Sequence, residues 1–311
     1  MSNNIYAECV LCPRLCRYDR RQGYANTILN TCREGETLRL ASAVVHHGEE
    51  PPVCGPGGSG AVFVTGCSLR CAYCQNVQIS QRHVGAAVDR NEFVRICLAL
   101  QSRGAENINI VTGSHAAPAI ADGLYAAKAA GLTLPILWNT SAYETSIALN
   151  CVRDLVDVYL PDLKMIDPSV ADKYIIPCDY PCNATRTIER MLSLRPGNVI
   201  IRHLVMPNQL ESTRDVLKWF NWNAKGRAKF SLMTQYTPPL DLNYYTPARR
   251  ITREEYDAAL SLLEEFDIQD GYYQEWEAES PQLPDFTQVN PFPGDLARPV
   301  WHWSCGFVKA E

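Results

Sequence analysis

The chain has 311 residues, of which 46% are hydrophobic, and this is enough to fill the core of one large or two ordinary domains, so a disordered regulator is excluded. Its 29 basic and 34 acidic residues leave a formal charge of -5, so the chain lacks the broad positive field that non-specific nucleic-acid binding needs. The first residues are polar and include cysteines, and no uninterrupted apolar run of about 18 residues occurs. We therefore expect a cytoplasmic protein that binds neither nucleic acid nor membrane.

Cysteine is the unusual residue of this sequence. Thirteen thiols in a reducing compartment are too many to be only small buried hydrophobes, and an odd number argues against a complete disulfide framework. Many of them fall in two tight groups, which are Cys9, Cys12, Cys16 and Cys32, and then Cys67, Cys71 and Cys74. We favour metal or cluster ligation as the explanation.

Short apolar runs alternate with helical patterns from residue 61 onward, which predicts an α/β architecture with a parallel sheet. The predicted strands lie at 61–66, 108–112, 135–139, 156–160, 199–206 and 230–235. One helical stripe begins after Asn91 and ends at Gly104, and a capping box from Thr252 to Glu255 begins another helix. Six strand–helix units favour one curved sheet, either an open barrel or a doubly wound sheet, and the pattern does not choose between them.

Both ends of the chain look irregular. Residues rich in Cys, Gly and Pro precede the first predicted strand, and residues 279–311 are rich in proline and aromatic side chains. No repeat or low-complexity tract separates them from the core. We therefore divide the chain into a Cys-rich extension at 1–60 with an auxiliary metal site, a barrel at 61–270, and a tail at 271–311 packed on the barrel.

Three cysteines directly follow the first predicted strand, in the segment Gly66-Cys67-Ser-Leu-Arg-Cys71-Ala-Tyr73-Cys74-Gln-Asn76. This is the end of a strand at which α/β enzymes build their active sites. Three thiolates on one loop can hold three corners of a [4Fe–4S] cube, which leaves the fourth iron open to the amino and carboxylate groups of a cofactor. The alternative is zinc, but structural zinc normally takes four protein ligands.

This CxxxCxxC arrangement, with an aromatic residue before the last cysteine, resembles the signature of the radical S-adenosylmethionine superfamily. The whole chain resembles the branch of uncharacterised iron–sulfur homologues of pyruvate formate-lyase activating enzyme. The matching stretches include Cys9-Val-Leu-Cys12-Pro-Arg-Leu-Cys16, His47-Gly-Glu-Glu-Pro51, Asn139-Thr-Ser-Ala-Tyr143, Tyr159-Leu-Pro-Asp162-Leu-Lys164 and Arg202-His-Leu-Val-Met-Pro207. The resemblance implies a partial (β/α)6 TIM-like barrel with the cluster and cofactor at its C-terminal mouth.

The resemblance also implies a chemistry. A one-electron donor such as flavodoxin or ferredoxin reduces the [4Fe–4S] cluster, S-adenosylmethionine is cleaved, and the 5′-deoxyadenosyl radical removes a hydrogen atom from a substrate. Cys67, Cys71 and Cys74 would hold the catalytic iron, and Tyr73 would pack near the adenine.

Cofactor contacts are further expected at the ends of the strands, from Asn76, Thr112, Gly113, Ser114, Asn139, Asp162, Lys164 and His203. The Thr112–Ser114 segment stands where many relatives carry Gly-Gly-Glu, so its backbone carbonyls are expected to accept from the cofactor's amino group. Lys164 would meet the cofactor's carboxylate and Asp162 the ribose or a cation, with a surface ion pair as the plain alternative. Arg202 and His203 point to opposite faces of one strand, so one of them should face the barrel interior.

The four amino-terminal cysteines make a complete set of four thiolate ligands. Either zinc or a second [4Fe–4S] cluster would fit, and the short spacing beside an iron-binding fold favours a cluster. Such a centre would relay electrons or brace the extension, and the sequence does not separate these roles.

Two classes of function follow. We favour a radical S-adenosylmethionine oxidoreductase that abstracts hydrogen. Within this class, we favour a glycyl-radical-enzyme activase over an enzyme that modifies a small molecule or peptide. The alternative of another class is a zinc-stabilised binding module with no catalysis.

Overall fold

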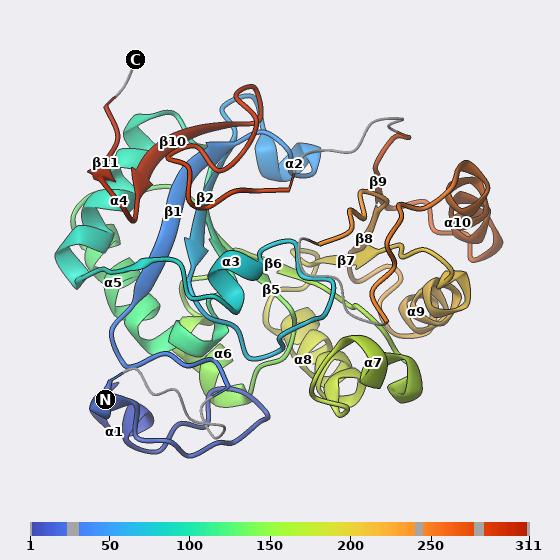
Figure 1. Cartoon of the computed structure of the whole chain (residues 1–311), viewed down its shortest axis with the longest axis horizontal. Coiled ribbons are helices and arrows are strands. Elements are labelled where there is room, and N and C mark those ends of the chain that lie inside the picture. Colours follow the sequence, from blue (N-terminus) through green and yellow to red (C-terminus); the bar gives the residue numbers. More distant parts are fainter. Residues whose placement is uncertain (1, 24–30, 240–244, 277–282, 310–311) are drawn as a thin grey trace.

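The computed structural model describes residues 2–23, 31–239, 245–276 and 283–309. Parallel strands bend into a partial barrel, and helices cover its outer face (Figure 1). All six predicted strands are confirmed: β2 (Ser59–Val64), β4 (Ile108–Val111), β5 (Ile136–Thr140), β6 (Val158–Pro161), β7 (Ile200–Leu204) and β8 (Lys229–Met233). They are buried on both faces almost throughout, which explains their continuous apolar runs.

The longer helices are α4 (Arg90–Ser102), α5 (Ala117–Ala129), α8 (Tyr180–Leu194), α9 (Leu210–Asn223) and α10 (Arg253–Glu265). The shorter ones are α1 (Ser2–Ala7), α2 (Pro51–Cys54), α3 (Val77–Ser80), α6 (Ser146–Val152) and α7 (Pro168–Tyr174), with 3-10 turns η1 (Arg20–Gln22) and η2 (Ser114–Ala116). The predicted capping box at the start of α10 is confirmed, since Thr252 and Glu255 cap each other's backbone N–H groups. In the described part of the chain, no helix combines the length and apolarity that crossing a membrane requires.

The barrel is assembled from two sheets that meet at β6 and β7. In the first sheet β2, β4, β5 and β6 pair in parallel, and in the second β7 and β8 do so. Parallel bridges from Tyr159 to Val199 and from Asp162 to Arg202 join the two. A further parallel strand, β9 (Gly271–Tyr273), pairs with β8 and was not predicted, so the strand order continues into the segment expected to be tail.

The prediction that both ends are irregular is wrong for several segments. The strand β1 (Arg39–His46) pairs antiparallel with β2, and β10 (Ala297–His302) pairs antiparallel with β1. Two short strands, β3 (Ala86–Ala87) and β11 (Gly306–Phe307), extend this edge. β1 was not predicted because serine and alanine occupy several of its buried positions, whereas large apolar side chains are typical of a buried strand.

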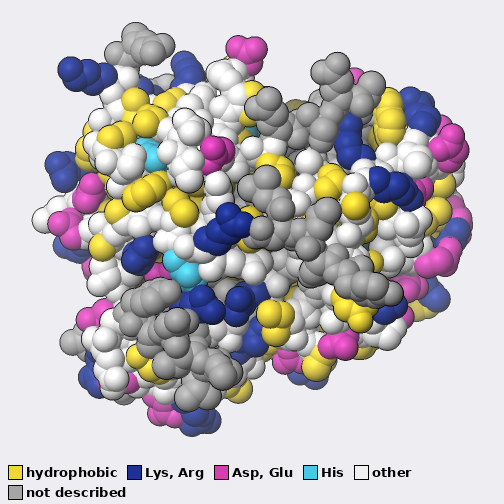
Figure 2. All heavy atoms as spheres, viewed as in Figure 1, with side chains coloured by type: hydrophobic (Ala, Val, Ile, Leu, Met, Phe, Trp, Pro, Cys, Tyr) yellow, Lys and Arg dark blue, Asp and Glu magenta, His cyan; other side chains and the backbone are white. Residues whose placement is uncertain are grey.

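The carboxyl-terminal segment packs into the open side of the barrel. The ring of Phe63, from β2, lies 5.2 Å from the ring of Phe286 and 5.4 Å from that of Phe292. Aromatic rings at such separations pack edge to face or tilted and bury a large apolar area. The tail therefore closes one wall of the interior. On the outer face shown in Figure 2, acidic and basic side chains are interspersed, as the near balance of charge in the sequence leads one to expect.

A buried ion pair joins the segment after β1 to the opposite side of the barrel. Arg202, on β7, donates from Nε to Glu50 Oε1 at 2.8 Å and from Nη2 to Glu49 Oε2 at 2.6 Å. Only 6% of the Arg202 side chain is exposed, so these charges are held away from water. Removing one partner of such a group leaves an uncompensated buried charge.

We predict that Arg202→Met lowers the free energy of unfolding by about 3–5 kcal/mol, because two buried carboxylates lose their counter-charge. Urea unfolding followed by circular dichroism measures this loss. The matched control is the triple variant that adds Glu49→Gln and Glu50→Gln, which should recover a large part of it. An unchanged unfolding midpoint in Arg202→Met would contradict this role of the ion pair.

Candidate functional site

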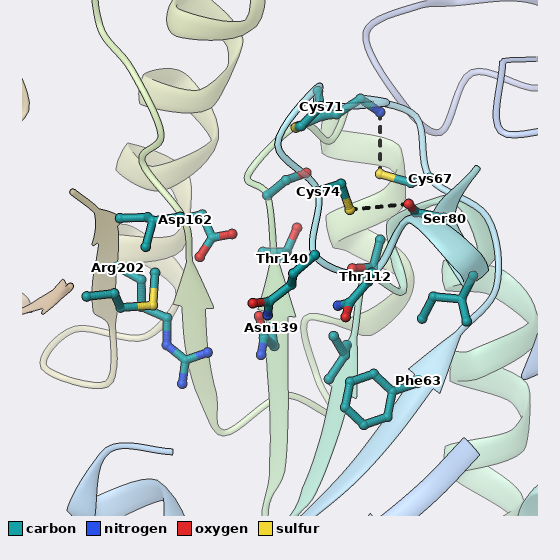
Figure 3. A pocket seen from close by; sticks show the side chains of 18 of the residues that line it. Phe63, Cys67, Cys71, Cys74, Ser80, Thr112, Asn139, Thr140, Asp162 and Arg202 are labelled. Carbon is teal, nitrogen blue, oxygen red and sulfur yellow. Dashed lines mark hydrogen bonds between the residues drawn. The ribbon is translucent and has the colours of Figure 1, made fainter. Parts of the chain in front are cut away.

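A pocket opens where the parallel strands end. Side chains from loops far apart in the sequence line it, among them Cys67, Cys71 and Cys74 after β2, Thr112 after β4, Asn139 and Thr140 of β5, Asp162 and Lys164 after β6, and Gln235 after β8. Figure 3 shows the three cysteines gathered at one end, with Thr112, Asn139 and Thr140 next to them and Asp162 and Arg202 to one side. The parallel strands bring these residues together because all their carboxyl ends meet at one edge.

The cysteine loop is held by hydrogen bonds to its sulfur atoms and to its backbone. The backbone N–H of Leu69 donates to Cys67 Sγ at 3.4 Å, and the Cys74 sulfur lies 3.3 Å from the Ser80 hydroxyl (Figure 3). Arg14, from the amino-terminal extension, donates from Nε to the Ser68 carbonyl at 2.6 Å. The loop is thus fixed from two elements before any ligand binds.

Two residues of this loop adopt left-handed backbone conformations. Gly66 has φ of 90°, and a Cβ built on it would lie 2.5 Å from the side chain of Glu34, so the position requires glycine. Arg70, directly before Cys71, has φ of 53°, which costs energy for a residue with a side chain. The loop therefore adopts a strained backbone conformation, and this conformation turns the three thiols to one side.

Burial raises the pKa of the Cys71 thiol and that of the Cys74 thiol, so both are neutral in the free chain. Metal binding requires thiolates, and iron would displace their protons.

Asp162 and Lys164 form an ion pair on the side of the pocket next to β6. Lys164 Nζ lies 2.6 Å from Asp162 Oδ2. Burial alone would lower the pKa of Lys164, but the charge of Asp162 together with the smaller effects of Tyr73, Cys71 and Tyr180 outweighs it. The pKa therefore lies well above its ordinary value and the ammonium keeps its proton. The buried Tyr180 orients this segment, because its hydroxyl donates to the Asp162 carbonyl and accepts from the Lys164 backbone N–H.

A buried glutamate, Glu144, binds the segments at the ends of β4 and β5, and the sequence did not identify it as part of the site. Glu144 accepts hydrogen bonds from Ser114 Oγ at 2.8 Å, from Trp138 Nε1 at 3.0 Å and from the Thr140 hydroxyl. Burial raises the pKa of Glu144. Of the expected Thr112–Ser114 segment, Thr112 lines the pocket with φ of 63°, whereas Ser114 lies behind it in this network.

Gly113 also lies behind the pocket, where a Cβ would meet Ile110 and Trp138 at 2.7 Å. No signal in the sequence joins Glu144 to these residues, since its partners come from two separate elements, η2 and β5.

Two buried oxygen atoms in the pocket wall lack partners. Asn76 Oδ1 and Gln235 Oε1 are enclosed and accept no hydrogen bond within the described residues. Leaving such atoms unpaired is unfavourable unless a ligand supplies donors. Tyr73 lines the same pocket, is buried, and has its ring 6.1 Å from that of Tyr174. The pocket thus combines three thiols, a fixed ammonium and unpaired acceptors, a donor set that fits an iron–sulfur cluster with a polar cofactor.

The structure places Arg202, and not the expected His203, on the pocket. Both ring nitrogens of His203 are satisfied elsewhere, by the Leu163 carbonyl at 2.9 Å and the Thr213 hydroxyl at 3.0 Å. Burial lowers the pKa of His203 to about 4, so the ring is neutral. Strand alternation predicted that only one of the two neighbours faces inward, and the inward one is the arginine.

The amino-terminal cysteines are not among the described residues that line this pocket, and the segment that carries the first three lies next to α1 and α6 (Figure 1). Cys9 and Cys32 are buried, and Cys12 and Cys16 are partly exposed. Within the described residues, no three His, Cys, Asp or Glu side chains are close enough to hold one metal ion. A cube distributes its thiolates over different irons, so this finding concerns sites for a single ion.

Residues 53–160 match a family described as a 4Fe-4S single cluster domain. This segment contains the whole of the cysteine loop and excludes the amino-terminal set. An uncharacterized protein of Methanocaldococcus jannaschii is 28% identical over 277 residues, which cover 86% of this chain and 78% of that protein.

Solved structures share the fold at low sequence identity. SuiB of Streptococcus suis, bound to S-adenosylmethionine, is 14% identical with a TM-score of 0.51 over 70% of this chain and 49% of SuiB. SuiB bound to its precursor peptide SuiA gives the same identity and TM-score over 67% of this chain and 46% of SuiB. A radical SAM methyltransferase from Sphaerobacter thermophilus is 12% identical with a TM-score of 0.52, over 70% of this chain and 66% of that one. The chain thus spans about half the length of SuiB.

The segment that matches the 4Fe-4S family contains the cysteine loop after β2. The fold prediction is confirmed, because the partial barrel is the architecture of these structures. The chain thus shares the fold of these structures and contains a segment that matches the 4Fe-4S single cluster domain.

Proposed function

We propose that this protein is an enzyme that reductively cleaves S-adenosylmethionine in the pocket after β2 and abstracts a hydrogen atom from a peptide or protein. The observation that carries the proposal is that Cys67, Cys71 and Cys74 line one pocket with the Asp162–Lys164 pair. When bound, the cluster passes one electron from a reduced donor to the sulfonium, whose cleavage yields methionine and, after a hydrogen atom leaves the substrate, 5′-deoxyadenosine.

The three cysteines would hold three irons of the cluster. Among the described residues that line the pocket, no fourth cysteine occurs. One iron is then left for the amino and carboxylate groups of the cofactor. The N–H of Leu69 donates to the Cys67 sulfur and so fixes the position of this proposed ligand.

Lys164 would bind the cofactor's carboxylate. An ammonium has three N–H donors, and the contact with Asp162 uses one of them. Because its pKa is raised, the ammonium remains charged at neutral pH. Asn76 and Gln235, whose side-chain oxygens lack partners, would accept from the cofactor's amino group or ribose hydroxyls, and Tyr73 would pack against the adenine.

A peptide or protein substrate is supported by the fold shared with SuiB, whose structure holds a precursor peptide. A glycyl-radical-enzyme activase is the version that the sequence resemblance favours, and modification of a small molecule is the second candidate. A one-electron donor such as flavodoxin or ferredoxin is proposed to reduce the cluster. The non-catalytic zinc module does not account for a pocket that joins the cysteine loop to Lys164.

For Cys9, Cys12, Cys16 and Cys32 we propose metal ligation as well, as a second centre outside the matched iron–sulfur domain.

The direct test of this function is anaerobic incubation of the iron-loaded protein with a reductant and S-adenosylmethionine. Chromatography should show 5′-deoxyadenosine. With candidate proteins or peptides deuterated at the Cα position, deuterium should appear in that product for the true substrate. Transfer only from small molecules of a cell extract would favour the second candidate.

We predict that Cys71→Ala abolishes 5′-deoxyadenosine formation, because a cube held by two thiolates cannot keep its open iron in place. Cys97→Ala is the matched control, since Cys97 is fully buried in α4 and does not line the pocket. It should retain cleavage. Continued cleavage by Cys71→Ala, at a rate comparable with the control, would remove Cys71 from the cluster.

We predict that Lys164→Ala weakens S-adenosylmethionine binding by about 10-fold or more, because a charge-assisted hydrogen bond contributes about 1.5–3 kcal/mol. Anaerobic titration calorimetry measures the affinity. Lys229→Ala is the control, because this lysine contacts the Tyr272 hydroxyl away from the pocket and should bind the cofactor as the wild type does. Equal affinities for the two variants would exclude Lys164 from the cofactor site.

A further inference from the structure

The amino-terminal extension buries a positive charge that has no acidic partner. Arg20 is 1% exposed, and within the described residues no carboxylate lies within 4 Å of its guanidinium. Its hydrogen bonds go to backbone carbonyls: Nε donates to Glu34 at 2.9 Å, Nη2 to Gly35 at 2.5 Å, and Nη1 to His115. An arginine remains protonated in proteins, and a buried charge without a counter-charge is strongly unfavourable.

The same guanidinium is directed at the cysteines. Its Nη1 lies 3.8 Å from Cys9 Sγ, and it interacts electrostatically with Cys32 as well. On another side it lies over the ring of Tyr6, with 4.9 Å from Cζ to the ring centroid. The sulfur atoms are therefore the groups on which a compensating negative charge can reside.

The backbone around these cysteines is shaped with unusual conformations. Leu15 and Arg17, on either side of Cys16, have φ of 44° and 54°, and Arg33, directly after Cys32, has φ of 57°. A left-handed conformation is unfavourable for a residue with a side chain, so it persists only where the surrounding structure imposes it. Arg70 adopts the same conformation next to Cys71 of the cluster loop. Both cysteine sets thus share a left-handed residue beside a ligand.

We infer that Cys9, Cys12, Cys16 and Cys32 form an anionic metal centre and that the buried Arg20 is its counter-charge. Four thiolates around a [4Fe–4S]²⁺ cube leave about two negative charges, which neutral thiols would not supply. The inference rests on the proposed second metal site and is independent of the radical chemistry. Arg20 is a positioning residue that stabilises the centre without ligating it.

Arg20 also connects the centre to the radical site. It donates to the backbone carbonyl of His115, and His115 Nε2 donates in turn to the Thr65 carbonyl at 2.7 Å, two residues before Cys67. Arg14 makes a further contact between the two cysteine segments, through its hydrogen bond to the Ser68 carbonyl. Loss of the centre should therefore also loosen the loop after β2.

The metal content of a variant that lacks Cys67, Cys71 and Cys74 tests the centre itself. With these three replaced by alanine, anaerobic iron–sulfide reconstitution and elemental analysis should find about four irons per chain. Adding Cys32→Ala should remove this metal. A metal-free triple variant would overturn the inference and leave the radical function standing. Failure of the wild type to cleave S-adenosylmethionine, with this metal intact, would overturn the proposed function alone.

Variants of Arg20 test the counter-charge in the same background. Arg20→Gln should lose metal to a chelator about 10–100-fold faster than the parent, the usual cost of removing a group that supports metal ligands. Arg195→Gln is the matched control, because Arg195 also donates only to carbonyls, Val156 and Arg153 among them, far from the cysteines in sequence. It should release metal at the parent rate.

Arg20→Lys keeps the positive charge but changes the shape of the side chain. It therefore distinguishes the effect of the charge from the effect of side-chain packing. It should release metal more slowly than Arg20→Gln. If only the lysine variant folds, release within about 10-fold of the parent supports the inference, and faster release contradicts it. A folded Arg20→Gln variant that holds its metal as the parent does would also contradict it.

Discussion

The structure depends on the loop that carries three thiols out of β2. Its backbone enters left-handed conformations at Gly66 and Arg70, and hydrogen bonds from Leu69, Arg14 and Ser80 hold it. The loop is therefore shaped before the cluster binds, at the expense of backbone strain that the surrounding barrel supports. Every other part of the pocket is placed relative to this loop by the parallel strands.

The extension and the tail complete the barrel that the six parallel strands leave open. β1 and β10 add antiparallel strands beside β2, Phe286 and Phe292 pack against Phe63, and Arg202 binds the glutamates that follow β1. The amino-terminal cysteines are tied to the same framework through Arg14 and Arg20. The ends of the chain are thus part of the wall of the site.

Local sequence patterns predicted much of this fold. The six strands are buried runs, and α10 begins at its capping box, because each of these signals lies within a short segment. The cysteine spacing is a local signal of the same kind, whereas Asp162 and Lys164 were expected at the site because of the family resemblance. Alternation along β7 left Arg202 and His203 equivalent, and only the packing of three elements around His203 decides between them. The Glu144 network and the counter-charge Arg20 likewise depend on segments that meet only in the folded chain, so no single stretch of sequence reveals them.

Direct contact between the cofactor and the cluster is the central claim, and electron–nuclear double resonance of the reduced protein tests it. With S-adenosylmethionine labelled with ¹⁵N at its amino group, the account predicts a ¹⁵N coupling to the cluster signal of the wild type. A cluster signal that is present but shows no coupling to the labelled nitrogen, at saturating cofactor, would contradict the account.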